Sequence, residues 1–312
     1  MSYDSILGTP DVASAMVPDQ TSTEIIKSAE QSSIIMSKAK KTPMSSKTYK
    51  QPVLASKAMA YWVNGETGLV QTSDLIWQNM TITAEPIGVI VPIPNDLIDD
   101  SNVPLWDEVK PEISEAFGMK IDSAALFGTD APVSWPTGLV PAATAAGNVV
   151  TVGTNPTIAA DVAALAGKVD SQGYAINGFA ARPGISWTLR QAVDTTKRPI
   201  FADALTGNGE MSLYGYGLDE VRNGAWNSEA AELLAVDWSK IVVGVRRDIT
   251  YDLYSEGVIS DADGSVVLNL MQQRCKALLV TMRVGLAVAA PVTRIGGDVQ
   301  KYPAGVLVPA GK

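Results

Sequence analysis

Apolar residues are densest over residues 81–93, and this segment predicts a strand. Its residues are mostly β-branched and nearly uninterrupted, which is typical of a strand that is buried on both faces. Pro92 and Pro94 are expected to end the strand, because proline has no N–H to donate to a β-ladder. A sharp polar and acidic turn over residues 95–102 follows, so the chain should leave the sheet at this point.

After this turn the apolar residues recur at three-to-four spacing, which predicts one long helix that ends near Gly128. The stripe consists of Leu105, Val109, Ile113, Phe117, Ile121 and Ala124. Ser101 or Asn102 can cap the helix, and Pro104 fits its first turn. Pro111 is expected to kink the helix or to restart it, because a proline ring clashes with the preceding turn.

The order of these signals resembles the tailed-phage major capsid protein family. The resemblance rests on the strand, the run from Val91 to Ser101, the long helix, and the glycine-proline runs at 127–130 and 136–140. It implies an α+β fold in which the helix is the spine of a peripheral domain and the chain then enters an axial α/β domain. It also implies an extended β-hairpin loop and an N-terminal arm. The implied function is structural, a major capsid protein that self-assembles through hexamers and pentamers into the icosahedral-type shell enclosing a phage genome.

Residues 58–84 alternate apolar with small or polar side chains, which predicts a long β-hairpin. Asn64-Gly65 is a strong turn signal. Aromatic side chains, among them Tyr61, Trp62 and Trp77, fall on both sides of a two-stranded ribbon that alone is only marginally stable in water. They pack either on their own domain or across a neighbouring subunit, and the second role is the one that the family's extended loop has.

The first 57 residues differ from the rest, because they are rich in Ser, Thr, Lys and Met and poor in aromatic residues. This composition is typical of a solvated tail in an isolated monomer. The family resemblance implies instead an arm that becomes ordered on a neighbouring subunit. A weak apolar pattern over residues 23–35 is compatible with a short helix within it.

The second half alternates predicted strands and helices, which indicates a mixed α/β layer domain. Helices are expected over residues 155–173 and 186–193, and strands over 176–182, 213–218, 241–245, 249–253 and 285–290. The segment 142–154 reads as a turn-rich crossing, and Asp261 to Gly264 as a turn. Val267, Met271, Cys275, Leu278 and Met282 fit one stripe of a further helix.

These expectations divide the chain into four parts. Residues 1–57 are the N-terminal arm and residues 58–84 the extended hairpin loop. Residues 85–150, joined by about 241–264, form the peripheral domain with the spine helix. Residues 151–240 and 265–312 form the axial domain.

Composition restricts the chemistry. The net charge of −9 and the pI near 4.6 argue against non-specific nucleic-acid binding. Histidine is absent and Cys275 is the only cysteine, so histidine-dependent catalysis and a disulfide framework are excluded, and no metal or cofactor is expected. The start has no signal-peptide pattern, and the longest apolar run, 277–292, is too short and interrupted to span a membrane. The chain is therefore expected not to be an enzyme.

Charge is segregated along the chain. Seven lysines and one acid lie between Lys27 and Lys57, whereas residues 58–109 carry eight acids and no base. Opposite potentials of this kind steer docking between chains, so the basic arm is expected to lie along the acidic ribbon and spine, its own or a neighbour's. The predicted subunit-interface residues are Lys38, Lys40, Lys41, Tyr61, Trp62, Glu66, Leu69, Trp77, Asp99 and Asp100.

Three alternatives remain open. An encapsulin-like compartment shell shares the fold, but that family lacks a long arm. A hydrolase would need the carboxylates between Asp96 and Glu108 as acid and base, although these charges also suit the positive end of the spine helix. A binding or adhesion module would stay a small oligomer.

The resemblance also implies partners and a location. The main partner is the chain itself, and candidate further partners are a scaffold, a maturation protease, a portal and decoration proteins. The DNA would be enclosed without specific binding. The protein would be assembled in the host cytoplasm and end in the virion.

Overall fold

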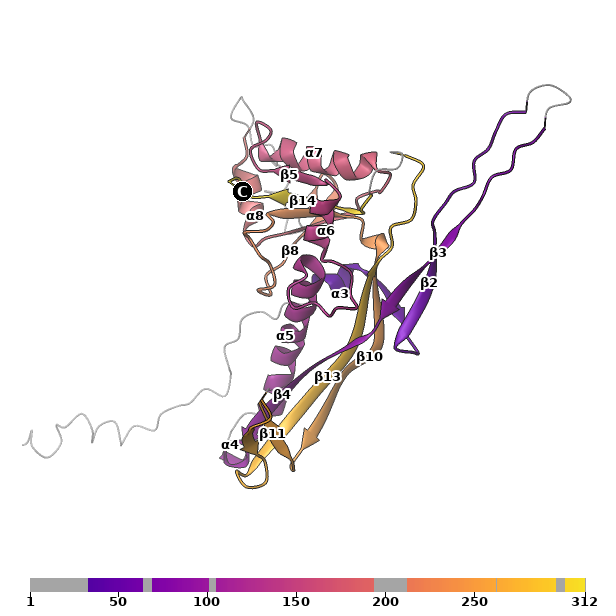
Figure 1. Cartoon of the computed structure of the whole chain (residues 1–312). Coiled ribbons are helices and arrows are strands. Elements are labelled where there is room, and N and C mark those ends of the chain that lie inside the picture. The colour runs from indigo at the N-terminus through magenta and orange to yellow at the C-terminus, as the bar shows by residue number, and fades with distance from the viewer. Residues whose placement is uncertain are drawn as a thin grey trace, which may run out of the picture.

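The computed structural model describes residues 33–63, 69–100, 105–193, 212–261, 263–295 and 301–311. Figure 1 shows a long helix, α5, beside long strands, a sheet domain at one end of them, and a ribbon that projects away from both. The layers are mixed helix and sheet, as the α+β expectation requires.

Four strands form the sheet beside α5, in the order β1-β10-β13-β4. The two long central strands, β10 (Ile241–Tyr254) and β13 (Cys275–Val288), pair antiparallel with Val245 opposite Val284. The outer strands are β1 (Lys40–Pro43), parallel to β10, and β4 (Glu85–Pro94), antiparallel to β13. Segments that are far apart in sequence therefore share one sheet.

The strand expected over residues 81–93 is present, but two of its predicted properties are wrong. It is two strands, β3 (Trp77–Thr83) and β4, and the side chains of β4 alternate between exposed and partly buried instead of being buried on both faces. β4 also continues through Pro92 to Pro94. Because it is the edge strand and its three prolines have the same parity, their missing N–H groups can all face away from β13.

The long helix is confirmed as α5 (Leu105–Phe127). It runs through Pro111 without an interruption and ends before Gly128, whose φ of 75° is the left-handed value that favours glycine after a helix. Ile113, Phe117, Ile121 and Ala124 of the predicted stripe are buried. The acidic turn before it contains a short helix, α4 (Asn95–Asp100), and the predicted caps Ser101 and Asn102 lie outside the described residues.

The helix expected over residues 267–282 is wrong. The chain there forms β12 (Val266–Asn269), a turn, and β13. The even-numbered residues from Leu278 to Leu286 are buried, while Thr281 and Arg283 are partly or fully exposed, so the period is two. Since β13 pairs with β10 and β4, residues 275–288 lie in the sheet beside α5 and not in the axial domain assigned to residues 265–312.

The second half of the segment 1–57 is part of the body of this chain and not a solvated tail. Residues 34–38 form α3 (Ile34–Lys38), which buries Ile34 and Ile35. β1 then joins β10, and β2 (Thr48–Leu54) pairs antiparallel with β3. Residues 1–32, which include most of the helix expected at 23–35, lie outside the described residues.

The ribbon begins earlier than predicted, because its ladder is formed by β2 and β3. Its base crosses the long sheet where Gly244 of β10 lies opposite Gly285 of β13. A Cβ on Gly285 would lie 2.6 Å from the Thr83 carbonyl oxygen. The glycine pair therefore permits the close approach that sets the path of the ribbon.

Six short strands form the second sheet, in the order β5-β14-β9-β6-β8-β7. They are β5 (Val149–Thr151), β14 (Ala304–Val308), β9 (Leu233–Val236), β6 (Gly178–Ala181), β8 (Tyr216–Glu220) and β7 (Ser212–Leu213). The predicted helices are confirmed as α7 (Ile158–Ser171) and α8 (Ile185–Gln191), with Thr157 capping α7.

Two expectations for this second sheet domain need correction. The segment 142–154 is not only a crossing, because it contains most of α6 (Leu139–Ala145) and all of β5. Residues 213–218 are not one strand, since Tyr214 and Gly215 turn the chain with positive φ between β7 and β8. A short 3-10 helix, η2 (Trp238–Lys240), leads into β10, and β11 (Val258–Ser260) pairs with β12 around the confirmed turn at Asp261.

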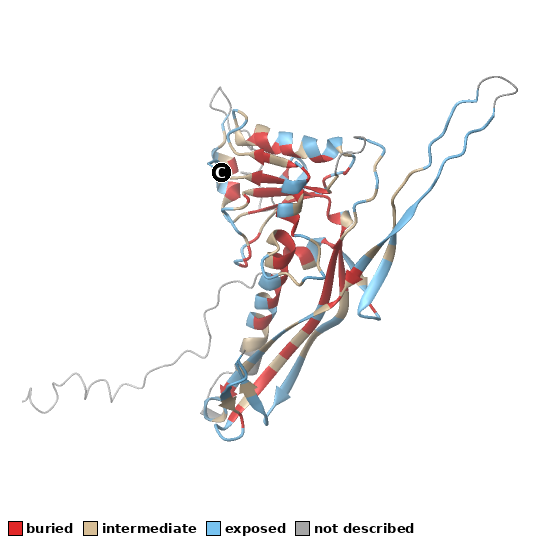
Figure 2. Cartoon of the chain, viewed as in Figure 1, coloured by how far each residue is buried: buried red, intermediate tan, exposed pale blue. Residues whose placement is uncertain are grey.

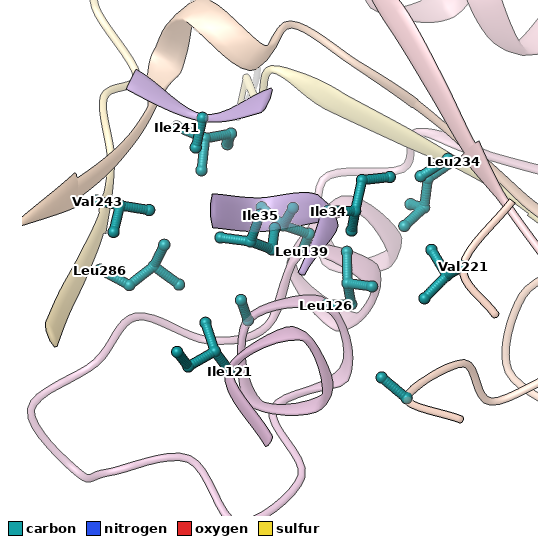
Figure 3. Packing of buried hydrophobic residues seen from close by; sticks show 14 of the residues in the cluster. Ile34, Ile35, Ile121, Leu126, Leu139, Val221, Leu234, Ile241, Val243 and Leu286 are labelled. Carbon is teal, nitrogen blue, oxygen red and sulfur yellow. The ribbon is translucent and has the colours of Figure 1, made fainter. Parts of the chain in front are cut away.

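The largest apolar core is continuous between the two sheets. It contains residues of α3, α5, α6 and both sheets, including Ile35, Leu126, Leu139, Leu234 and Ile241 (Figure 3). A second core lies under α7 and α8 on the other face of the six-stranded sheet. Burial is concentrated in these regions, whereas the ribbon is almost entirely exposed (Figure 2).

Candidate assembly surfaces

The ribbon presents large side chains to solvent at the outer end of the β2–β3 ladder and beyond it. Trp62 is fully exposed, Leu69 is 91% exposed, and Trp77 and Tyr61 are 61% and 47% exposed. The two limbs run side by side without a regular ladder, although Ser73 Oγ accepts a hydrogen bond from Met59 N at 2.7 Å. The strand expected at Met59 to Val63 is therefore wrong, and the aromatic side chains do not pack on their own domain.

Of the other predicted interface residues, Glu66 lies outside the described residues, as does the Asn64-Gly65 turn. Asp99 and Asp100 belong to α4, but their side chains are outside the described part of the structure. Asp96 at the start of α4 forms an ion pair with Arg274 at 2.8 Å, and both side chains are exposed. This pair ties α4 to the turn before β13.

The carboxylates that a hydrolase would use do not form a described site. Asp96 faces Arg274 and not a second carboxylate. Within the described ranges, no three histidine, cysteine or acidic side chains lie close enough together to hold a metal ion. Cys275 is buried in a small apolar cluster with Leu270 and Ala277, as expected of a structural cysteine.

The Asp261 turn is closed by its own side chain. The carboxylate of Asp261 accepts hydrogen bonds from the backbone N–H groups of Asp263 and Ser265 at 3.1 and 2.9 Å. These bonds to the neighbouring backbone form the turn that the sequence predicts at this position. In the described part of the chain, none of the helices has the length and apolar character needed to cross a membrane.

The three predicted lysines have different surroundings. Lys38 at the end of α3 forms an ion pair with Asp219 of β8 at 3.0 Å, so its partner in this chain is not the acidic ribbon. Lys40 and Lys41 lie in β1 opposite Val242 and Val243, and both are exposed. They remain candidates for a contact between chains.

We expect that changing both Lys40 and Lys41 to glutamate weakens assembly at low salt. The two charges are exposed on an edge strand, and the loss of attraction should fade as salt screens charges beyond about 10 Å near 0.1 M. Light scattering against salt concentration measures this, with the Lys40→Arg, Lys41→Arg double variant as the charge-preserving control. Equal assembly of the glutamate variant and the parent at low salt would show that these charges serve only solubility.

A buried carboxylate that sequence reasoning missed joins three segments of the chain. Asp122 of α5 is fully buried. It accepts hydrogen bonds from Ser33 Oγ at 2.6 Å, from the backbone N–H of Ile34 and Ile35 at 3.0 and 3.1 Å, and from Asn223 Nδ2 at 2.7 Å. It therefore caps α3 and fixes the point where the arm joins the spine. A lone acid among the apolar residues of the last helical turns was the available signal.

Burial raises the pKa of the Asp122 carboxyl above its ordinary value, although the four hydrogen bonds lower it. No described basic side chain forms an ion pair with Asp122. The site thus depends on neutral donors for its stability.

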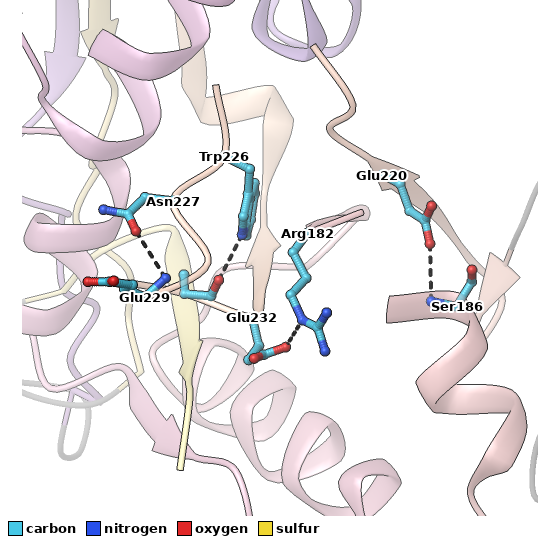
Figure 4. Close-up of polar contacts among 8 residues, drawn as sticks. Arg182, Ser186, Glu220, Trp226, Asn227, Glu229 and Glu232 are labelled. Carbon is cyan, nitrogen blue, oxygen red and sulfur yellow. Dashed lines mark hydrogen bonds and ion pairs between the residues drawn. The ribbon is translucent and has the colours of Figure 1, made fainter. Parts of the chain in front are cut away.

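Polar contacts hold the loop that carries Asn223. Figure 4 shows Trp226 Nε1 donating to the Ala231 carbonyl at 2.7 Å and Asn227 Oδ1 accepting from Glu229 N at 3.0 Å. Arg182 forms an ion pair with Glu232 at the end of this loop. Together these bonds fix the loop that meets Asp122.

Glu220, at the beginning of the same loop, accepts a hydrogen bond from Ser186 N at 3.1 Å and forms an ion pair with Arg222 at 2.6 Å. Burial acts to raise the pKa of Glu220, but the bonds from Ser186 and Arg222 outweigh it and the pKa is lowered. The carboxylate of Glu220 therefore fixes the first turn of α8 to β8.

Comparison with known proteins agrees with this architecture. Residues 13–292 match the model of the phage capsid family. A curated relative, the "Major capsid protein" of Staphylococcus phage 80alpha, is 28% identical over 283 residues, which are 87% of this chain and 81% of the relative.

Two solved structures are similar over nearly the whole chain. One, from Microbacterium phage Oxtober96, has a TM-score of 0.87 and 32% identity, with 96% of this chain and 99% of that chain covered. Another, from Mycobacterium phage Adephagia, has a TM-score of 0.86 and 29% identity, with 97% and 98% covered. The spine helix, the long sheet and the projecting ribbon are thus those of a known fold, and the chain belongs to the phage capsid family.

Proposed function

We propose that this chain is the major capsid protein of a phage and that it forms the shell of the virion. The observation that carries the proposal is the ribbon, which extends from the body and leaves Trp62, Leu69 and Trp77 exposed. Exposed apolar surface of this kind marks a contact with another molecule. The family match and the relative named major capsid protein support the same role.

The assembly we propose is a closed shell of hexamers and pentamers. A ribbon that contacts a different surface on the next copy makes a head-to-tail contact, and such contacts generate rings when the rotation closes. A scaffold, a maturation protease, a portal and decoration proteins are proposed further partners, and the host cytoplasm is the proposed place of assembly. The enclosed DNA needs no specific binding site on this acidic chain.

We also propose a division of the chain that follows its sheets. The peripheral domain combines α5 with the β1-β10-β13-β4 sheet, and the axial domain combines the six-stranded sheet with α6, α7 and α8. The ribbon from β2 to β3 is the extended loop, and the arm is the chain that precedes α3. Asp122 lies where the arm, the spine and the axial domain meet.

The alternatives have less support. An encapsulin-like shell would use the same fold, but the named relatives belong to phages. A hydrolase lacks a described pair of facing carboxylates, and a small adhesion module gives no reason for the exposed Trp62, Leu69 and Trp77 of the ribbon.

Sedimentation velocity of the expressed protein tests the proposal. We expect species with the masses of hexamers, pentamers or closed shells, formed through interfaces of at least about 1,000 Å². A monomer at every protein and salt concentration, with scaffold and protease partners supplied, would contradict it.

We further expect that the shells are not welded covalently. Some family members join a lysine of the extended loop to an asparagine of a neighbour, but residues 58–109 contain no lysine. Asn269, at the end of β12, therefore has no amine from the ribbon beyond Lys57 to react with. Boiled, detergent-treated particles should run on a gel as single chains, whereas a ladder of multimers would refute this.

A further inference from the structure

A basic cleft lies between the base of the ribbon and the segment that follows β13. Its volume is about 910 Å³, and it is lined by residues 55–57, Met59, residues 290–294, Tyr174 and Lys301. Its charged side chains are Lys57, Arg294 and Lys301, and none of the described residues that line it is acidic. The chain thus concentrates positive charge at one place although its net charge is −9.

Hydrogen bonds from separate segments fix the walls of this cleft. Arg294 Nη2 donates to the Ala58 carbonyl at 2.8 Å, which ties the segment after β13 to the ribbon base. Tyr174 Oη donates to the Pro291 carbonyl at 3.1 Å, and Thr293 Oγ1 donates to the Gln172 carbonyl. The walls of the cleft and the side chain of Arg294 are therefore held in place before any partner binds.

The positive charges of the cleft are not neutralised by the described residues of this chain. No described carboxylate lies within ion-pair distance of any of the three side chains. Lys301 Nζ donates to Thr293 Oγ1 at 3.0 Å and to the carbonyls of Thr293 and Ile295. Lys57, which is half-buried, makes no described hydrogen bond. The amine of Lys57 and the remaining N–H groups of Arg294 can therefore donate hydrogen bonds to a bound acceptor. Lys301 has used its donors within the chain, but its positive charge still attracts an anion.

We propose that this cleft binds a carboxylate side chain of a second copy of the chain, at a contact between neighbouring subunits. The inference rests on the proposed shell function. It is supported by charge complementarity, because residues 58–109 of every copy carry eight acids and no base. It is also supported by position, since the cleft lies beside the ribbon that reaches toward a neighbour. The phosphates of enclosed DNA are the competing ligand.

Cross-linking with a carbodiimide tests this contact directly, because the reagent joins a lysine amine to a carboxylate that already touches it. Equal amounts of ¹⁴N- and ¹⁵N-labelled protein are assembled together, cross-linked and digested. We expect peptides that link Lys57 of one isotope to an aspartate or glutamate of the other. Absence of a Lys57 cross-link, or a link only within one isotope, for example to Asp298 of the same chain, would overturn the proposal.

Charge reversal supplies the second measurement. The Lys57→Glu variant should need at least about tenfold more protein to assemble than the parent, and Lys57→Arg should assemble as the parent does. Circular dichroism of both variants checks that the fold is intact. If the parent forms shells and Lys57→Glu forms them equally well, the cleft proposal fails while the shell function stands. If the parent never assembles, the proposed function itself fails.

DNA provides the test of the competing ligand. Shells assembled after nuclease treatment should give the same Lys57 cross-links as untreated shells. If Lys57 forms cross-links, or is needed for assembly, only when DNA is present, the cleft binds DNA phosphates and the proposal is overturned.

Discussion

Removal of residues 60–72, with Met59 joined to Ser73 through Asn-Gly, is expected to abolish shells and leave the fold intact. The deletion removes Tyr61, Trp62 and Leu69, whose exposed side chains make no contribution to the described cores. It keeps the β2–β3 ladder and the packing of Ile82. Because Met59 and Ser73 are already hydrogen-bonded, a two-residue turn can close the shortened ribbon. Circular dichroism and electron microscopy of the variant measure the two outcomes.

A length-preserving control separates the aromatic contacts from the turn. Replacement of Asn64 and Thr67 by serine leaves Gly65, Glu66 and Gly68 in place, keeps Tyr61, Trp62 and Leu69, and should still assemble. Loss of the circular dichroism signal in the deletion variant would mean that the ribbon belongs to the core of its own chain. Normal shells from the deletion variant would remove the ribbon from the assembly contacts.

The Asp122→Ala variant is expected to lose roughly 3 kcal/mol of unfolding free energy. The substitution leaves four buried donors, on Ser33, Ile34, Ile35 and Asn223, without their acceptor. Urea unfolding of the parent and the variant in the same assembly state measures the change. An exposed carboxylate provides the matched control: Asp130→Asn removes the charge that pairs with Lys120, keeps a side chain suited to the positive φ of 50°, and should change the urea midpoint little.

The pH dependence of this loss has a definite sign. Because burial raises the folded-state pKa of Asp122, its stabilising contribution is fully present below the unfolded-state pKa and is lost as the pH rises through the folded-state pKa. The deficit of Asp122→Ala should therefore be larger at acidic pH than at neutral pH. A urea midpoint equal to that of the parent at every pH would show that Asp122 does not hold the arm to the spine.

The spine could be predicted because its pattern is strong and local. The three-to-four spacing of Ile113, Phe117 and Ile121 has no competing interpretation over so long a segment. The β13 region was misread because Val267, Met271, Cys275, Leu278 and Met282 fit a helical stripe although the segment is a strand. The buried positions of residues 278–286 also recur at every second residue, which is the period of a strand. Pairing with β10 on one side and β4 on the other selects the strand over the helix.

Features of the arm and of the candidate surfaces could be predicted where they depend on neighbouring residues, and not where they depend on contacts between distant segments. The sequence left open whether Trp62 and Trp77 pack on their own domain, and the structure leaves both exposed on a ribbon too thin to bury its two faces. The polar composition of residues 33–54 concealed their place in the body, because β1 pairs with a strand about two hundred residues away. Asp122 and the basic cleft depend on contacts between such distant segments, so spacing along the chain does not indicate them.

Electron cryomicroscopy of the purified, assembled protein tests the central claim most directly. We expect hollow particles built from rings of five and six copies, in which the ribbon of each copy, with Trp62 and Trp77, lies against the next copy. Particles or small oligomers in which the ribbon folds back on its own chain, or a map with no repeated rings, would contradict it.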